Sequence, residues 1–188
     1  MKNIVLIGFM GSGKSTIGRR LAQRLGWDCI DTDHLIEARE GRSIAEIFSQ
    51  SGEDHFRKLE AEMIKEVLGY TKAVISTGGG AILNPENLQE LLTRAHVICL
   101  WLSPEEAYER TRHHSHRPLL QAPDPLARIT EILEEREPLY KQAHYLVNTV
   151  GRSILEITDS IIRYVDRQEP DFGHGRDTHP PGASGSGL

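Results

Sequence analysis

Residues 8–16 form a glycine-rich loop in a setting that few folds provide. They read Gly-Phe-Met-Gly-Ser-Gly-Lys-Ser-Thr, a full match to the phosphate-binding pattern G-x-x-x-x-G-K-[ST]. An apolar run at 4–7 precedes the loop as a buried strand would, and residues 14–25 follow it with apolar side chains at helical spacing. A strand, a glycine loop and a helix in this order direct backbone N–H groups and a helix N-terminus at one anion. The chain is therefore predicted to bind a nucleoside triphosphate.

Each part of this loop has an expected role in binding a nucleoside triphosphate. The ammonium group of Lys14 would reach the β- and γ-phosphates, and the hydroxyl of Ser15 would ligate Mg²⁺. Backbone N–H groups would supply the rest of the phosphate site. The residues predicted to hold the nucleotide here are Gly11, Ser12, Gly13, Lys14, Ser15 and Thr16.

The chain as a whole excludes several classes of protein. Its 188 residues indicate a single domain, and its net charge of −5 provides no basic field to attract nucleic acid. The longest apolar run, 97–102, is far shorter than the roughly 18 residues of a membrane helix. The first expected strand begins almost at once, so we expect no targeting peptide. Cys29 and Cys99 lie in apolar segments, and we expect two reduced core thiols in a cytoplasmic protein.

Short apolar runs alternate with amphipathic stretches along the chain. The runs at 3–7, 29–31, 73–76, 97–102 and 145–147 are typical of strands, and helical spacing occurs near 14–25, 34–40, 43–50, 55–68, 85–93, 104–112, 125–137 and 153–165. This alternation predicts an α/β fold with a mostly parallel sheet, in which ligands bind beyond the carboxyl ends of the strands. From about Gln168, glycine, proline and serine dominate, so we predict a domain over 1–167 and a disordered tail over 168–188.

Two acidic residues, Asp31 and Asp33, follow the second expected strand. If the chain is still extended there, both carboxylates point to the same side. One could serve a magnesium ion near Ser15, and the other could orient an attacking hydroxyl and accept its proton. In the alternative interpretation, Asp33 only caps the helix expected at 34–40. The intact phosphate loop favours the functional interpretation.

Three consecutive glycines, Gly78, Gly79 and Gly80, follow the third expected strand. Glycines remove side chains where a ligand must approach the backbone, and they expose N–H donors to an anion. A flexible turn is the alternative. Their position at the carboxyl end of a strand favours a ligand site.

Arg57 and Arg136 lie beside or on apolar helical stripes. A charge in such a place needs a partner or a ligand, because an unpaired buried charge is costly. Glu60 or Glu134 could be a purely structural partner. Otherwise the two guanidinium groups form a clamp for a carboxylate, which they match bidentately.

The segment at about 111–124 is predicted to be a mobile, cationic lid. It carries arginines, histidines and prolines with few apolar anchors. Arg117 is the best candidate to reach a transferring phosphoryl group in the way of an arginine finger. The histidines at 113, 114 and 116 could bind a metal, although solvated side chains are the favoured interpretation.

Taken together, these motifs resemble those of the shikimate kinase family. The matching pieces are the loop at 8–16, Asp31-x-Asp33, Phe56-Arg57-x-x-Glu60, Gly78-Gly79-Gly80, Arg117-Pro118-Leu119-Leu120 and Arg136-x-Pro138-Leu139-Tyr140, in the family's order over about residues 1–165. The resemblance implies a three-layer P-loop kinase fold, related to nucleoside monophosphate kinases, with a central five-stranded parallel sheet. It also implies transfer of the ATP γ-phosphate to the 3-hydroxyl of shikimate, in the route to chorismate and the aromatic amino acids.

The same resemblance implies roles for individual residues. The catalytic residues would be Lys14, Asp33 and Arg117. The residues around shikimate would be Asp33, Arg57, Gly79, Gly80 and Arg136, with Phe48 and Phe56 as pocket walls. Mg²⁺ would be held by Ser15 and, through water, by Asp31. ATP would also contact Arg110, Arg117 and Arg152, with adenine flanked by Arg110 and residues 148–152. The partners expected are these small molecules alone, and the chain is expected to be a monomer.

Other functions fit these residues less well. A gluconate kinase shares a similar phosphate loop, but the pair Arg57 and Arg136 suits a carboxylated acceptor better, and it argues against a nucleoside monophosphate kinase too. A guanine-reading switch needs an Asn-Lys-x-Asp segment, and no asparagine here is followed by lysine. A catalytically silent binding module would not need Lys14, Asp33 and Arg117 together.

Overall fold

The protein, described by a computed structural model, is placed over residues 1–112 and 123–170. Its strands are β1 (Asn3–Ile7), β2 (Asp28–Asp31), β3 (Ala73–Ser76), β4 (Ala95–Trp101) and β5 (Tyr145–Asn148). Its α-helices are α1 (Lys14–Leu25), α2 (Thr32–Glu40), α3 (Ile44–Val67), α4 (Pro85–Arg94), α5 (Pro104–Thr111), α6 (Pro125–Tyr140) and α7 (Ile154–Gln168), and a short 3₁₀ helix, η1, spans Ala81–Leu83.

The five strands form one sheet in the order β2-β3-β1-β4-β5, and every neighbouring pair is parallel. The predicted five-stranded parallel sheet is therefore confirmed. The neighbours of β1 are β3 on one side and β4 on the other, so the chain connections lead away from β1 in opposite directions along the sheet. In open α/β sheets, ligands bind in the crevice at such a reversal. The loop after β1 occupies this place.

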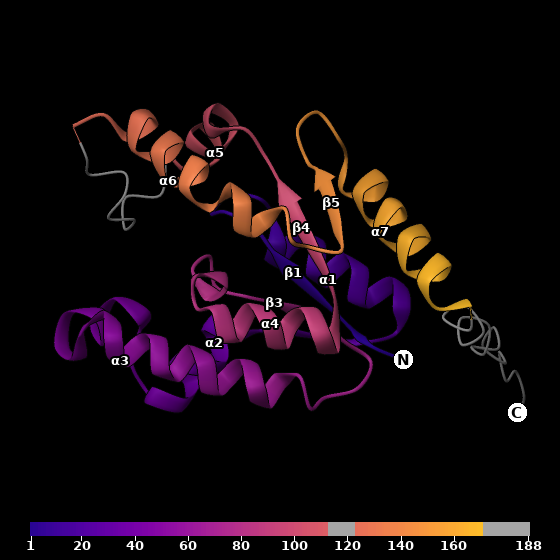
Figure 1. The fold of residues 1–188 in the computed structure, drawn as a ribbon, viewed down its shortest axis with the longest axis horizontal. Helices are drawn as coiled ribbons and strands as arrows, with labels where there is room; N and C mark the ends of the chain where they lie inside the picture. Colours follow the sequence, from indigo (N-terminus) through magenta and orange to yellow (C-terminus); the bar gives the residue numbers. More distant parts are fainter. Residues whose placement is uncertain (113–122, 171–188) are drawn as a thin grey trace, which may run out of the picture.

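Helices cover both faces of the sheet, which gives the three layers expected (Figure 1). Successive residues of β1 point to opposite faces, so Ile4 and Leu6 pack with α1 and α7, whereas Val5 and Ile7 pack with α3, α4 and α6. All four side chains are fully buried, because a parallel sheet between two helical layers has no solvated face. No helix in the described ranges is both long and apolar enough to cross a bilayer.

The helices begin and end close to the positions predicted from spacing. The helices expected at 43–50 and 55–68 run together as α3, with a kink at Gly52, whose φ of 80° and ψ of 169° are not helical. This conformation is essentially restricted to glycine. The kink turns the first part of α3 so that the ring of Phe48 packs on that of Phe56, with centroids 4.8 Å apart.

The two cysteines differ from each other in exposure. Cys99 is buried in β4, and both thiols are free. Cys29 is exposed, so the expectation of a buried thiol is wrong at this position. The reason is that β2 is an edge strand, and the apolar run that predicts a strand does not say whether the strand lies at the centre or the edge of the sheet.

The folded part of the chain extends past the boundary expected at residue 167. Helix α7 includes Gln168, and Glu169 holds it to the start of the sheet. One oxygen of the Glu169 carboxylate accepts from the backbone N–H of Lys2 at 3.0 Å and lies 2.9 Å from Nε2 of His96. Residues 168 and 169 therefore belong to the domain. The remainder of the predicted tail, 171–188, lies outside the described residues.

Two truncations should separate these contacts from the tail. A chain that ends after Asp166 loses both Glu169 hydrogen bonds and the last two residues of α7, which we expect to cost about 1–3 kcal/mol and lower the melting temperature by roughly 3–10 °C. A chain that ends after Pro170 keeps them and should melt with the full chain, since 171–188 shows no apolar periodicity. Calorimetric melting of all three chains is the measurement. An equal loss in both truncated chains would contradict this account.

Candidate active site

The phosphate loop leads from β1 into α1, whose N-terminus differs from those of the other α-helices. Six of the seven α-helices in the described ranges have an N-cap side chain that accepts a backbone N–H, but the N-cap of α1 is Gly13 and provides none. The first turn of α1 also lacks an acidic residue. Its N–H groups are thus left to an external anion, which the positive end of the helix dipole also favours.

Lys14 and Ser12 lie within the loop itself. The ammonium group of Lys14 donates to the carbonyls of Gly8 at 2.8 Å and Phe9 at 3.1 Å, so it lies over the loop where a bound phosphate would meet it. The hydroxyl of Ser12 is buried and has no hydrogen-bond partner among the described residues. The loop therefore holds one cation and one buried hydroxyl that lacks a hydrogen-bond partner in the described ranges.

Ser15 and Asp31 meet at the carboxyl end of β2. The Ser15 hydroxyl donates to Oδ2 of Asp31 at 2.9 Å. A hydroxyl and a carboxylate oxygen side by side are hard oxygen ligands of the kind Mg²⁺ takes, directly or through water. The two residues fit the predicted magnesium site.

The chain is not extended from Asp31 to Asp33, so that premise of the sequence analysis is wrong. Helix α2 begins at Thr32, and its N-cap is Asp31, whose Oδ1 accepts from the backbone N–H of Asp33 at 3.1 Å. The alternative in which Asp33 caps the helix is also wrong. Because Asp31 takes the capping role, the side chain of Asp33 is left for other contacts.

The carboxyl groups of Asp33 and Glu60 meet at Gly78. Oδ1 of Asp33 and Oε1 of Glu60 are buried without a hydrogen-bond partner in the described parts of the chain. A Cβ atom at Gly78 would lie 2.6 Å from the former and 2.9 Å from the latter, so a larger residue there would displace the two carboxyl groups. Burial, and then the negative charges of Asp31 and Glu60, raise the pKa of Asp33 to about 6, against the pull of Lys14. Burial also raises the pKa of Glu60, which Arg57 partly offsets.

Arg57 lies beside this pair and is held from three sides. Its guanidinium group donates to Glu60 at 2.8 Å and to Glu53 at 2.9 Å, and it lies 5.3 Å from the centre of the Phe56 ring. A Cβ atom at Gly80 would lie 2.5 Å from its Nη1 atom. A larger residue at this position would force the guanidinium group to move from its present place.

Arg136 reaches the same glycine segment from α6. It donates to the carbonyl of Gly79 at 3.1 Å. In contrast to Arg57, it forms no ion pair with any residue of 1–112 or 123–170, and the suggested partner Glu134 is exposed. Of the two arginines of the predicted clamp, Arg57 is thus paired with carboxylates, whereas Arg136 has no ion-pair partner in the described ranges.

The expected ATP residues Arg110 and Arg152 lie on the other side of the loop. Arg110 binds the carbonyl of Gly11 and the hydroxyl and carbonyl of Thr149, each at 3.3 Å, and joins α5 to the phosphate loop and to the loop after β5. Arg152 donates to the carbonyl of Glu156 at 3.0 Å, within the same β5–α7 region.

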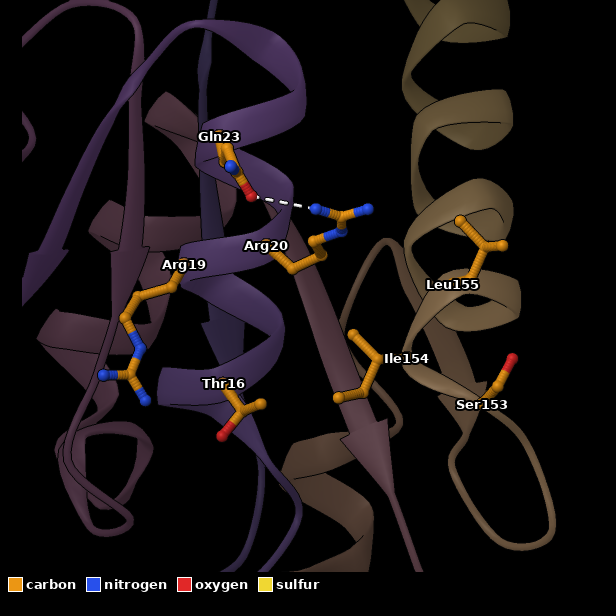
Figure 2. Close-up of a pocket in the computed structure, with 7 residues that line it drawn as sticks. All are labelled: Thr16, Arg19, Arg20, Gln23, Ser153, Ile154 and Leu155. Atoms are coloured by element: carbon orange, nitrogen blue, oxygen red, sulfur yellow. Dashed lines mark hydrogen bonds between the residues drawn. The ribbon is translucent and has the colours of Figure 1, made fainter.

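A groove of about 700 Å³ continues from the end of the phosphate loop between α1 and α7. Figure 2 shows its seven lining residues, Thr16, Arg19, Arg20, Gln23, Ser153, Ile154 and Leu155, with the first four on α1 and the others at the start of α7. Arg20 and Gln23 are joined by a 2.9 Å hydrogen bond, and the apolar side chains of Ile154 and Leu155 are exposed. The groove adjoins the phosphate loop and does not include the glycine triplet.

Some predicted features lie outside the described residues, and one contact was not foreseen. Arg117, the three lid histidines and most of the lid fall within 113–122. The sequence motifs give no role to Thr32, which lies between the two aspartates. It is fully buried, and its hydroxyl accepts from the backbone N–H of Gly78 at 3.3 Å. Its position between Asp31 and Asp33 could have indicated such a contact, because consecutive residues at the start of a helix point toward different neighbours.

The sheet with a phosphate loop after its central strand defines a P-loop kinase fold, in which the loop binds the nucleotide and the neighbouring strand ends face an acceptor. A family model described as shikimate kinase matches residues 10–166. The chain belongs to the shikimate kinase family and is thus a phosphotransferase that acts on a hydroxyl group. The fold and the family expected from the motifs are confirmed.

Close relatives and solved structures agree with this assignment. A shikimate kinase of Thermodesulfovibrio yellowstonii is 44% identical over 167 residues, which cover 89% of this chain and 96% of the relative. One from Thermus thermophilus is 46% identical over 160 residues, 85% of this chain and 87% of the relative. The structure of the Acinetobacter baumannii shikimate kinase in complex with shikimate superimposes with a TM-score of 0.85 at 36% identity, over 90% of this chain and 95% of that one.

The rival acceptor, gluconate, receives little support from these comparisons. A gluconokinase from Sinorhizobium meliloti is 18% identical, with a TM-score of 0.60, and covers 95% of this chain and 98% of its own. This degree of likeness shows a shared fold alone. The residues at the strand ends must therefore decide between acceptors.

Proposed function

We propose that this chain transfers the γ-phosphoryl group of ATP to the 3-hydroxyl of shikimate, giving shikimate 3-phosphate and ADP. The observation that carries the proposal is the convergence of Asp33, Arg57 and Arg136 on Gly78–Gly80. Within the described residues, Asp33 has one carboxylate oxygen without a hydrogen-bond partner, which suits a hydroxyl donor, and Arg136 has no ion-pair partner, which suits a carboxylate ligand. Shikimate carries both groups, as a hydroxylated acid.

In this proposal the acceptor hydroxyl is oriented by Asp33. The hydroxyl oxygen forms a bond to the γ-phosphorus, its proton passes to the Asp33 carboxylate, and the bond between that phosphorus and the bridging oxygen of ADP breaks. A carboxyl pKa raised to about 6 makes Asp33 a better proton acceptor than an ordinary aspartate and still leaves it ionised at neutral pH. Arg57, Arg136 and the glycine triplet would hold the acid in place.

The nucleotide side of the reaction falls to the phosphate loop. Lys14 would neutralise the developing charge on the phosphates, and Gly11, Ser12, Gly13, Ser15 and Thr16 would surround them. Ser15, and Asp31 through water, would hold Mg²⁺, which would supply positive charge against the phosphates. Arg117 would reach the transferring group from the lid, and adenine would lie between Arg110 and the β5–α7 loop near Arg152. We further propose that the chain works as a monomer in the cytoplasm, with residues 1–170 as the catalytic domain.

An ADP-release assay with a small panel of acceptors tests this proposal. The panel holds shikimate, quinate, gluconate, AMP and no acceptor, each with Mg²⁺ and ATP. We expect robust turnover with shikimate and only background release without an acceptor. Turnover with gluconate or AMP but not with shikimate would overturn the proposed substrate and leave the kinase fold unaffected.

Replacement of Arg136 should weaken binding of the acid far more than binding of ATP. In Arg136→Ala we expect a loss of shikimate affinity of about 30-fold to several thousand-fold, because a charge partner of the carboxylate is removed. Arg136→Lys should restore little, because an ammonium group cannot make the bidentate contact. Calorimetric titration of both ligands is the measurement.

Arg128→Ala provides the matched control for this prediction. Arg128 lies on the same helix, is exposed, and pairs with Glu131 away from the glycine triplet. Both affinities should stay near those of the unaltered chain in this variant. Equal losses of acid and nucleotide affinity in Arg136→Ala would show that Arg136 serves only to hold α6 in place.

A further inference from the structure

The first turn of α2 is tied to both halves of the site. Asp31 binds Ser15 of the phosphate loop, Thr32 accepts the N–H of Gly78, and Asp33 lies against Gly78 with its carboxyl group. Three consecutive residues thus connect the predicted metal site, the glycine triplet and the proposed proton acceptor. A movement of this turn cannot leave any of the three contacts unchanged.

The carboxylate of Asp31 divides its oxygens between two tasks. Oδ1 caps α2 by accepting from the backbone N–H of Asp33 at 3.1 Å, and Oδ2 accepts from the Ser15 hydroxyl at 2.9 Å. A cap needs only one oxygen, as the serine caps of α3, α5 and α7 illustrate. Because the two oxygens belong to one planar group, a contact that restrains Oδ2 also restricts the positions open to Oδ1.

We propose that Asp31 is a positioning residue through which a Mg²⁺–nucleotide complex at Ser15 strengthens binding of the acceptor acid at Asp33. This inference rests on the function proposed above. A cation beside Ser15 makes its hydroxyl a stronger donor and attracts Oδ2, which holds Oδ1 in its capping position. The start of α2 is then ordered before the acid arrives, so the acid binds at a smaller ordering cost. By linkage, the acid must strengthen nucleotide binding by the same factor.

Two substitutions at Asp31 separate its capping of α2 from its hydrogen bond with Ser15. Asp31→Ser retains a hydroxyl that can cap α2, but its side chain is too short to reach Ser15 as well. Asp31→Ala removes both contacts. Asn84→Ala is the matched control, because Asn84 likewise caps a helix, accepting from the backbone N–H of Glu86 at 2.9 Å, and is not among the residues assigned to the site.

The experiment measures the dissociation constant of shikimate by calorimetry, once with EDTA and no nucleotide and once with Mg²⁺–ADP at a concentration that saturates each variant. We expect Mg²⁺–ADP to tighten shikimate binding by about fivefold or more in the unaltered chain and in Asn84→Ala. In Asp31→Ser, the dissociation constant of shikimate should be the same with and without Mg²⁺–ADP, because the contact with Ser15 is lost while the cap remains. In Asp31→Ala, binding should be weaker by about fivefold in both buffers, because the cap is lost.

The outcomes distinguish this inference from the proposed function. Coupling that persists in Asp31→Ser, or that is absent from the unaltered chain, would overturn the inference and leave the proposed function standing. A chain that binds no shikimate in either buffer would overturn both. If Asp31→Ala does not fold, which its melting curve beside that of Asn84→Ala would reveal, Asp31→Ser still decides the matter.

Discussion

Replacing Lys14 with methionine is expected to lower the rate of phosphoryl transfer by about 10³-fold or more while the fold persists. Phosphoryl transfer depends on positioning and charge neutralisation, and Lys14 is the cation placed over the phosphate loop. Methionine has a similar length and no charge. The backbone carbonyls of Gly8 and Phe9 lose a donor in this variant, which should cost only about 1 kcal/mol of stability.

Lys2→Met is the control for Lys14→Met. Lys2 also donates its ammonium group to a backbone carbonyl, that of Thr93 at 2.9 Å, but it lies at the opposite end of the sheet from the phosphate loop. Turnover with shikimate and circular dichroism should be measured on the same preparations of both variants. A Lys14→Met enzyme with the rate of the unaltered chain would refute the assigned role of the loop.

Much of the fold follows from local sequence signals, and the exceptions have identifiable causes. Strands β1 and β3 have the predicted bounds, because they are central strands with unbroken apolar runs. Strand β4 begins at Ala95, two residues before the predicted start, since the buried polar residue His96 is compensated by Glu169 from the far end of the chain. Such a long-range contact leaves no local signal. The exposure of Cys29 was missed for the related reason that strand order is a tertiary property.

The sequence identified the residues that meet at the candidate site, but not the hydrogen bonds between them. The motifs pointed to Asp33, Arg57 and Arg136, and the structure brings all three to the glycine triplet. The sequence did not predict that Asp31 caps α2 and leaves the side chain of Asp33 for the site, because the choice of capping residue depends on where the first helical turn begins. The sequence also did not predict that Oε1 of Glu60 is buried without a hydrogen-bond partner among the described residues. The sequence indicates Glu60 only as an arginine partner. It does pair with Arg57 through Oε2, while Oε1 has no hydrogen-bond partner in the part of the chain that the structure describes.

Replacing Asp33 with asparagine is expected to lower turnover and raise stability at the same time. Asparagine keeps the shape and hydrogen-bonding capacity of the side chain but cannot accept the proton of the acceptor hydroxyl. We therefore expect turnover to fall by about 10²–10⁴-fold with nucleotide affinity nearly unchanged. A residue that serves structure alone would give the opposite sign of the stability change.

The stability gain follows from the direction of the Asp33 pKa shift. The folded state raises this pKa from 3.8 to about 6, so between these values it binds more protons than the unfolded state. The carboxyl group therefore imposes no penalty below pH 4, a growing penalty as the pH rises toward 6, and a constant one of up to about 3 kcal/mol above it. Asp33→Asn removes this penalty. It should stabilise the chain by about 1–3 kcal/mol at pH 8 and by little near pH 4.

Urea unfolding between pH 4 and pH 8, in buffer without Mg²⁺ or nucleotide, measures this effect, with Asp28→Asn at an exposed position of β2 as the control.

Turnover across a Mg²⁺ titration then separates the two aspartates of the motif. Raising Mg²⁺ should partly restore Asp31→Asn, because that variant weakens the metal site, and it should leave Asp33→Asn unchanged. An Asp33→Asn enzyme rescued by Mg²⁺, beside an Asp31→Asn enzyme that is not, would reverse the roles. An Asp33→Asn chain less stable than the unaltered one at pH 8 would show that the buried carboxylate stabilises the fold, against the direction of its pKa.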